Sequence, residues 1–360
     1  MSLPREAPGI VVACSLILLF GCTTVLSKRY LDARTSRAGR FFQRGRQLDQ
    51  QGKTAAALEE FRNALAISRD QREYLMAVAL GLMRENRSSE AETYFQELLR
   101  DRPGDALSNL MLARIALQRR ETDAAIDYYN RAIYGRWPAD TDESRLRTRW
   151  ELVATLKKAN RRPELVAELL QISSDEPSNK EDRTKVAEML LEAGAAEQAS
   201  NLFHELLQEG IRGRQFYAAY GESLLETGDY NGARDALVKA DPGDEKVREN
   251  LALVNTVLSL DPLARNVSRN ERYERSVALL KRVLALFDQC GAAKQAAGAP
   301  VQIAAARDAL TARPGSRNLQ ELTDQRVSLA EQLWDARHDI CGSVLSDDEP
   351  LRLAMRRLSR

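Results

Sequence analysis

Small and apolar residues recur along this chain with a spacing of 34 residues. Units that share the pattern begin at Ala38, Arg72, Ala106, Leu146, Lys180 and Arg214, and a six-residue insertion around residues 135–138 is the one break in the spacing. Each unit contains two stretches in which apolar residues return every three or four positions, the period of a helix that buries one face. The pattern predicts six consecutive helical hairpins over residues 38–245, each packed on the next.

Five positions of the unit carry this prediction. The eighth and twentieth are small in nearly every unit, which lets the two helices of a hairpin cross closely. They are Gly45, Ala79, Ala113, Val153, Ala187 and Gly221, and Ala57, Ala91, Ala125, Leu165, Ala199 and Ala233. The twenty-fourth is bulky and the twenty-seventh apolar: Phe61, Phe95, Tyr129, Leu169, Phe203 and Leu237, and Ala64, Leu98, Ala132, Ile172, Leu206 and Ala240. The fifteenth is Gly or Asn, which favours a left-handed turn between the helices: Gly52, Asn86, Asn160, Gly194 and Gly228, with Arg120 as the exception.

The combined pattern resembles the tetratricopeptide repeat. The resemblance implies an all-α fold, a right-handed superhelical solenoid of helix-turn-helix hairpins, and a role in binding other proteins. The bulky fourth position of the family is poorly kept, so the first helices are expected to be less regular. That position holds Phe41, Leu75, Asn109, Arg149, Arg183 and Tyr217.

The resemblance also implies that certain positions of the first helices face a concave groove. In units two to four these positions form an apolar surface edged with positive charge, where we expect an amphipathic or extended partner segment to bind. The residues are Met76, Leu80, Met83, Leu107, Leu110, Arg114, Trp150, Lys157 and Lys158. In units five and six the same positions are acidic: Glu181, Glu188, Glu192, Glu222 and Glu226.

The C-terminal third departs from the 34-residue spacing. Residues 246–345 are predicted to form a degenerate seventh repeat and a helical cap, with helices from Arg248 and over residues 272–289, 301–312 and 318–340. Residues 346–360 are predicted to be a flexible basic tail. Cys290 and Cys341 are the only thiols of this region, which is consistent either with a disulfide formed in an oxidising compartment or with two buried, unpaired thiols.

Residues 1–26 contain a membrane-directed segment, because no charge occurs from Ala7 to Leu26, the length of a membrane-spanning helix. Leu19 to Cys22 resembles a lipoprotein signal, in which Cys22 would be lipidated. A cleaved secretory signal, an uncleaved anchor and a buried soluble helix are the alternatives. The basic linker over residues 27–37 favours a cytoplasmic location for the helical hairpins, whereas Cys22 and the Cys290 and Cys341 pair favour the periplasmic side.

Composition limits the chemistry that this chain can perform. The chain has 53 Lys and Arg residues and 52 Asp and Glu residues. It therefore lacks the overall positive charge that is typical of nucleic-acid-binding proteins. The two histidines, His204 and His338, are too few for a supported metal site, and no phosphate-binding loop or nucleophile motif occurs. We therefore expect neither an enzyme nor a cofactor, metal or small-molecule substrate.

The function expected from the sequence is a membrane-tethered scaffold or assembly factor of a bacterial envelope complex, with proteins as its partners. The alternative is a membrane-anchored regulatory or chaperone-like adaptor that faces the cytoplasm. The machine served by such a scaffold is an analogy with the family and not an inference from the residues.

Overall fold

The computed structural model describes residues 34–137, 141–175, 179–264, 267–288, 300–315, 318–341 and 348–358. Within these ranges the regular structure is helical, apart from one isolated β-bridge. The chain divides into two compact units, Met1–Leu165 and Val166–Arg360, and each is described by itself.

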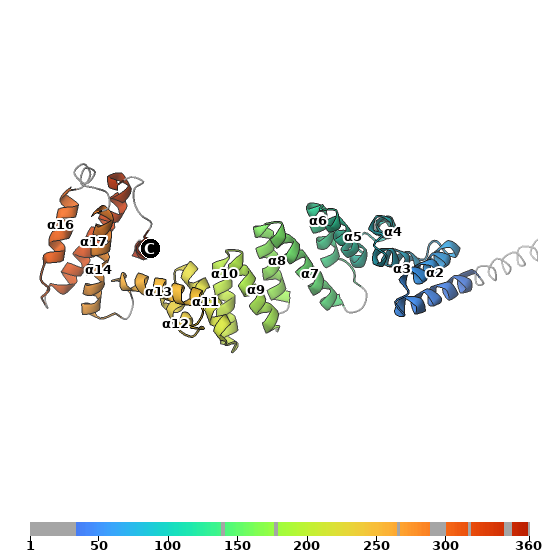
Figure 1. Ribbon diagram of the computed structural model, residues 1–360, viewed down its shortest axis with the longest axis horizontal. Helices are drawn as coiled ribbons and strands as arrows, with labels where there is room; N and C mark the ends of the chain where they lie inside the picture. The colour runs from blue at the N-terminus through green and yellow to red at the C-terminus, as the bar shows by residue number, and fades with distance from the viewer. Residues whose placement is uncertain are drawn as a thin grey trace, which may run out of the picture. The chain divides into compact units, whose positions relative to one another are not determined.

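The first unit is a series of helical hairpins. A helix over residues 34–50 is followed by α2 (Thr54–Ile67), α3 (Arg72–Arg84), α4 (Ser88–Asp101), α5 (Ala106–Gln118), α6 (Thr122–Ile133) and α7 (Thr141–Lys158), and α8 (Arg162–Asp175) begins at its end. Helix α3 pairs with α4 and α5 with α6, and α2, α4 and α6 pack on the first helix of the next hairpin (Figure 1). Helices α3 and α5 begin at the residues where the 34-residue spacing places the second and third units.

The second unit continues the hairpins and then changes character. Its helices are α9 (Lys180–Glu192), α10 (Ala196–Gln208), α11 (Arg214–Thr227), α12 (Tyr230–Leu237), α13 (Glu245–Ser259), α14 (Arg269–Asp288), α16 (Pro300–Thr311), α17 (Leu319–Cys341) and α18 (Glu349–Leu358). Helices α14, α16 and α17 pack side by side (Figure 1). The helices predicted for the C-terminal third are therefore present, with ends that differ by a few residues.

The predicted repeat positions form the core of both units. All six residues at each of the eighth, twentieth, twenty-fourth and twenty-seventh positions are buried. A Cβ added at Gly45 would lie 2.6 Å from the ring of Phe61, and one added at Gly221 would lie 2.6 Å from Leu237. The eighth position therefore meets the twenty-fourth of the same unit, as expected where two helices cross closely.

The turn at the fifteenth position is left-handed in every unit, including the one that lacks Gly or Asn. The φ angles of Gly52, Asn86, Asn160, Gly194 and Gly228 lie between 54° and 86°, and that of Arg120 is 63°. A residue with a Cβ meets steric strain in this conformation. Hairpin geometry has thus overridden the local preference of Arg120.

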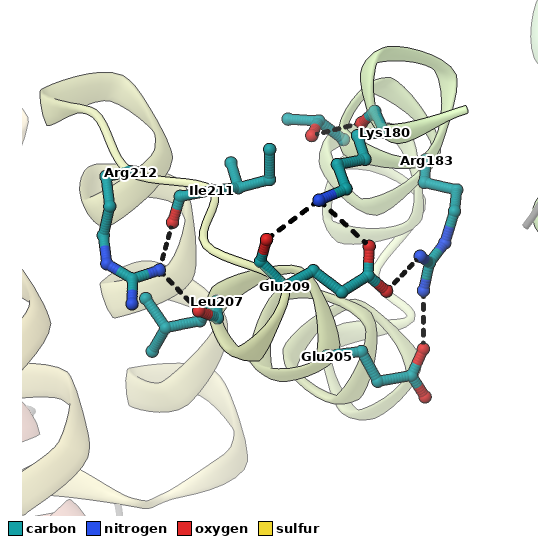
Figure 2. Close-up of polar contacts among 8 residues, drawn as sticks. Lys180, Arg183, Glu205, Leu207, Glu209, Ile211 and Arg212 are labelled. Carbon is teal, nitrogen blue, oxygen red and sulfur yellow. Dashed lines mark hydrogen bonds and ion pairs between the residues drawn. The ribbon is translucent and has the colours of Figure 1, made fainter. Parts of the chain in front are cut away.

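The irregular fourth position of the fifth repeat, Arg183, places a cation in the interior of the second compact unit. Figure 2 shows Arg183 of α9 reaching two carboxylates, that of Glu205 in α10 at 2.8 Å and that of Glu209, the residue after α10. Lys180 of α9 donates a hydrogen bond of 2.8 Å to the carbonyl oxygen of Glu209. The Arg183 side chain is only 7% exposed, so these two carboxylates neutralise a buried charge. Charge pairing therefore takes the place of apolar packing at this position.

The C-terminal end corrects one prediction. In place of a flexible tail over residues 346–360, residues Glu349–Leu358 form α18, which packs on α13 and α14. Leu351, Ala354 and Met355 are buried, because apolar residues three and four apart lie on one face of the helix. Ion pairs hold both ends, Asp348 with Arg282 at 2.7 Å and Arg357 with Asp261 at 2.8 Å.

Two further predictions concern segments that the structure describes only in part. Among the described residues no helix is long and apolar enough to span a bilayer, and the segment from Ala7 to Leu26, with Cys22, lies outside them. Cys341 is fully buried and disulfide-bonded. Its predicted partner, Cys290, also lies outside the described residues, so the pairing stays a prediction.

Candidate partner-binding surface

The residues predicted to bind a partner segment come from the first helices of three successive hairpins in the first unit. We call this surface the first-helix face and define it by Met76, Leu80 and Met83 of α3, Leu107 and Arg114 of α5, and Trp150, Lys157 and Lys158 of α7. The apolar members are half-buried and the three cations are exposed. They therefore combine partly accessible apolar surface with positive charge.

Leu110 does not belong to this face. It is 6% exposed, and it lies in α5, whose residues are buried around most of the helix. Since α4 and α6 both pack on α5, the groove position of this hairpin is taken into the core. The prediction that Leu110 contacts a partner is wrong for this reason.

A charged contact joins α5 to α7 within the face. Arg114 donates to both carboxylate oxygens of Glu151, at 2.6 and 3.0 Å, and Tyr129 of α6 donates to the same carboxylate at 3.1 Å. Burial, followed by the negative charge of Glu151, raises the pKa of Tyr129, and the hydrogen bonds to Glu151 raise the pKa of Arg114. A bidentate pair of this kind fixes the relative orientation of two helices. Arg114 therefore links α5 to α7 and also contributes a positive charge to the face.

A pocket of about 920 Å³ opens beside the α3 end of the face. Its wall is built from the start of α3, the α4–α5 turn, the start of α5 and the segment after α6. The lining residues are Gln71, Arg72, Glu73, Met76, Asp101, Arg102, Pro103, Gly104, Asp105, Leu107, Arg136 and Trp137. Met76 and Leu107 belong both to the pocket and to the first-helix face, so the two are continuous.

The six-residue insertion builds one wall of this pocket. The amide of Arg136 donates to the carbonyl oxygen of Gly104 at 2.7 Å, and the amide of Ala106 donates to the carbonyl oxygen of Arg136 at 3.2 Å. This parallel bridge holds the insertion against the α4–α5 turn and places Trp137 on the lining. Gly135 permits the approach, because a Cβ there would lie 2.7 Å from the carbonyl oxygen of Arg131 and 2.8 Å from that of Gly104.

An ion pair between two lining residues also supports the pocket. Arg72 lies 2.7 Å from Asp105, and it also donates to the carbonyl oxygen of Leu98 at 2.9 Å. Asp105 in turn caps the N-terminus of α5 by accepting a hydrogen bond of 3.0 Å from the amide of Ser108. The bridge with Arg136 and the partly buried ion pair with Arg72 therefore both hold the lining of the pocket at Asp105.

Sequence reasoning identified the insertion but not the pocket. Trp137 and Arg136 interrupt the repeat pattern in a chain with only 6% aromatic residues, which is the signal that could have drawn attention to them. Arg72 and Asp105 gave no signal, because each occupies an ordinary helix-start position and their pairing depends on how two hairpins pack.

The acidic positions of the second unit lie on α9 and α11. Desolvation and the charge of Glu192 raise the pKa of Glu188, and desolvation and the charge of Glu222 raise the pKa of Glu226. Glu222 also pairs with Lys246 of α13 at 2.7 Å.

His204 is hydrogen-bonded through its two ring nitrogens to Tyr220 and Gln208, at 3.2 and 2.9 Å. Over the described residues, no group of three metal-ligating side chains gathers.

Comparison with known proteins agrees with the repeat pattern. A family model described as tetratricopeptide repeat matches residues 76–141, which include most of α3, all of α4 to α6 and the insertion. A comparison with curated protein sequences finds no match.

Several solved structures show a distant likeness. The structure of pilF of Pseudomonas aeruginosa is 16% identical, covers 61% of this chain and 99% of its own, and gives a TM-score of 0.38. A tetratricopeptide repeat protein of Parabacteroides merdae is 12% identical, with 81% and 98% covered and a TM-score of 0.37. YrrB, described as a tetratricopeptide-repeat protein with an unusual peptide-binding site, is 14% identical, with 52% and 96% covered and a TM-score of 0.39. With TM-scores below 0.5, these likenesses carry no weight for the function of this chain.

The repeat positions therefore have both a structural and a family assignment. The core positions are buried in all six units, the turns are left-handed in all six, and the family model matches the hairpins α3–α4 and α5–α6. Residues 76–141 match the tetratricopeptide-repeat family, and the described part of the chain has the all-α fold of helical hairpins that this repeat implies.

Proposed function

We propose that this protein is an interaction scaffold that holds a partner segment on the first-helix face. The observation that carries the proposal is the run of half-buried apolar side chains along α3 and α5, namely Met76, Leu80, Met83 and Leu107. Accessible apolar surface of this kind marks a protein-binding site, and methionine adapts to the shape of a ligand. The family assignment supports the same role.

The charges at the edge of the face favour a partner segment with an acidic side. Lys157 and Lys158 of α7 are exposed, and Arg114 of α5 is exposed but pairs with Glu151, so a segment with one apolar and one acidic face would contact both parts of the surface. An amphipathic helix or an extended strand with alternating residues meets this requirement.

Affinity capture with mild crosslinking tests the proposal. Full-length protein and its Met83→Glu and Trp150→Ala variants serve as baits, because both side chains lie on the face and are only half-buried. The control is Glu97→Ala, an exposed position of the second helix α4. We expect the face variants to lose a set of proteins that the control retains. Identical capture by all baits would contradict the proposal.

The proposal extends to a membrane tether at the N-terminus and to service in a bacterial envelope complex. The uncharged segment from Ala7 to Leu26 and the lipoprotein-like Cys22 support a scaffold on the periplasmic side. The basic residues Lys28, Arg29, Arg34 and Arg37 favour the second candidate, an anchored adaptor that faces the cytoplasm. Mass analysis of the mature N-terminus and a reporter fused after Arg360 separate the two. A lipidated Cys22 with a periplasmic reporter supports the scaffold, and an unprocessed N-terminus with a cytoplasmic reporter supports the adaptor.

A further inference from the structure

We infer that the pocket built by the insertion is a specificity site for an aromatic side chain of the partner segment. The inference rests on the proposed function and adds the residue that the partner must present. The pocket shares Met76 and Leu107 with the first-helix face, so a segment bound on the face can place one side chain in it.

The lining of the pocket has the chemistry that favours an aromatic ring. Trp137 presents an indole, against which rings pack in stacked or edge-to-face arrangements. Met76 supplies a thioether, which makes favourable contacts with ring edges. Leu107 and Pro103 complete an apolar part of the wall that would desolvate the ring.

The charged residues of the pocket strengthen this preference. Arg102 after α4 and Arg136 of the insertion are exposed lining residues, and a guanidinium group attracts the face of an aromatic ring. Glu73 and Asp101 line the same pocket, so these four charges balance. A ring, which needs no counter-charge, suits such a lining better than an acidic or a basic side chain.

The size and rigidity of the pocket fit this role. A volume of about 920 Å³ lies in the range of sites that hold a small molecule, and it accommodates a large side chain with the neighbouring backbone. The bridge between Arg136 and Gly104 and the pair of Arg72 with Asp105 hold its walls in place. A preformed site loses little conformational entropy when its ligand binds.

A random heptapeptide library displayed on phage, selected on the purified full chain, tests the inference. We expect one position of the enriched peptides to be dominated by Phe, Tyr or Trp. Trp137→Ala removes the indole, and Gly135→Ala displaces the insertion, so both variants should lose this enrichment. Gly39→Ala is the matched control, because a Cβ at Gly39 meets nothing within 4 Å. Circular dichroism establishes that each variant is folded.

Synthetic peptides then separate aromatic recognition from simple apolar burial. A selected peptide is compared with versions that carry cyclohexylalanine or alanine at the aromatic position. Binding is followed by the fluorescence anisotropy of dye-labelled peptides on the unaltered full chain. We expect cyclohexylalanine to weaken binding about 2- to 10-fold, the range typical of lost aromatic contacts, and alanine to weaken it further.

The outcomes distinguish this inference from the proposed function. Peptides that lack an aromatic position, or that bind Trp137→Ala as well as the parent while Met83→Glu abolishes binding, would overturn the pocket inference alone. Equal affinity for phenylalanine and cyclohexylalanine would also overturn it. Peptides that bind Trp137→Ala and Met83→Glu as well as they bind the parent would overturn the pocket inference and the proposed function together. A selection that enriches no peptide would have the same consequence.

Discussion

The backbone amide of Arg136 donates a 2.7 Å hydrogen bond to the carbonyl oxygen of Gly104. This contact joins the insertion to the turn between α4 and α5. Because the neighbouring amide of Ala106 returns a hydrogen bond to Arg136, the insertion is held as a short parallel bridge. An interruption of the repeat spacing has thereby become the wall of a pocket next to the first-helix face.

Gly135→Ala is expected to destabilise the first unit. The added Cβ would lie 2.7 and 2.8 Å from two backbone carbonyl oxygens, a contact that only a backbone shift relieves. Crowding of this kind costs about 1–3 kcal/mol of unfolding free energy. Urea denaturation measures the loss. Gly39→Ala is the control, because its Cβ meets nothing within 4 Å, and alanine inside the helix over residues 34–50 is expected to stabilise the protein. Equal stability of Gly135→Ala and the parent would show that the insertion is not tightly held.

Arg120→Gly is expected to stabilise the protein. Arg120 occupies the left-handed turn with a φ of 63°, where a side chain costs roughly 1–2 kcal/mol and glycine costs almost nothing. The greater freedom of glycine in the unfolded chain offsets part of this gain, which leaves about 0.5–1 kcal/mol. The reverse change at an equivalent turn, Gly52→Ala, should destabilise. Denaturation midpoints that move in the same direction for both variants would refute the account of these turns.

Arg183→Met is expected to lower the stability of the second unit. The change removes a nearly buried cation, takes from Glu205 its pairing with Arg183, and leaves Glu209 with Lys180 at 4.0 Å. Glu205 and Glu209 are exposed, so solvent screens the loss of the pairs, and we expect it to be about 0.5–1 kcal/mol. Arg212→Met is the matched control, because Arg212 is exposed and donates to the backbone carbonyl of Ile211 (Figure 2). If both variants lose the same stability, the pairing of Arg183 is not what joins α9 to α10.

Glu188→Gln is expected to stabilise the protein at neutral pH and to have no effect in acid. The pKa of Glu188 is raised in the folded state by desolvation and by Glu192, so folding disfavours its charged form. The associated stability is present below the unfolded pKa and is lost as pH rises through the folded pKa. Glutamine does not ionise, so the Glu188→Gln variant does not lose this stability at pH 7. Because the side chain is exposed, solvent screening keeps the gain below about 0.5 kcal/mol. Thermal unfolding at about pH 3 and pH 7 provides the comparison, and a gain of equal size at both would contradict it.

The sequence was sufficient to predict the hairpins, because their signal is collective. Small residues such as Ala79 and Ala91 are uninformative singly, but six units in one register leave few alternative arrangements. The left-handed turn at Arg120 depends on register and not on residue type. The helix α18 was missed because Leu351, Ala354 and Met355 form too short an apolar face to outweigh the surrounding arginines in a pattern.

The candidate binding surface was predicted less completely. Family positions selected Met76, Leu80 and Leu107, which are half-buried, and also Leu110, which is buried. Its burial depends on how tightly α4 and α6 enclose α5, which spacing does not encode. The pocket could not be predicted from the sequence for a similar reason, because its walls come from four segments that meet only after the hairpins stack.

Site-specific photocrosslinking in the host cell tests the central claim most directly. A photoreactive phenylalanine is placed at Leu80 on the first-helix face, and in separate proteins at Glu97 of α4 and Asp127 of α6, which are exposed on second helices. The account predicts a covalent adduct with a partner protein from Leu80 and none from Glu97 or Asp127. Adducts from the second-helix positions without one from Leu80 would contradict it.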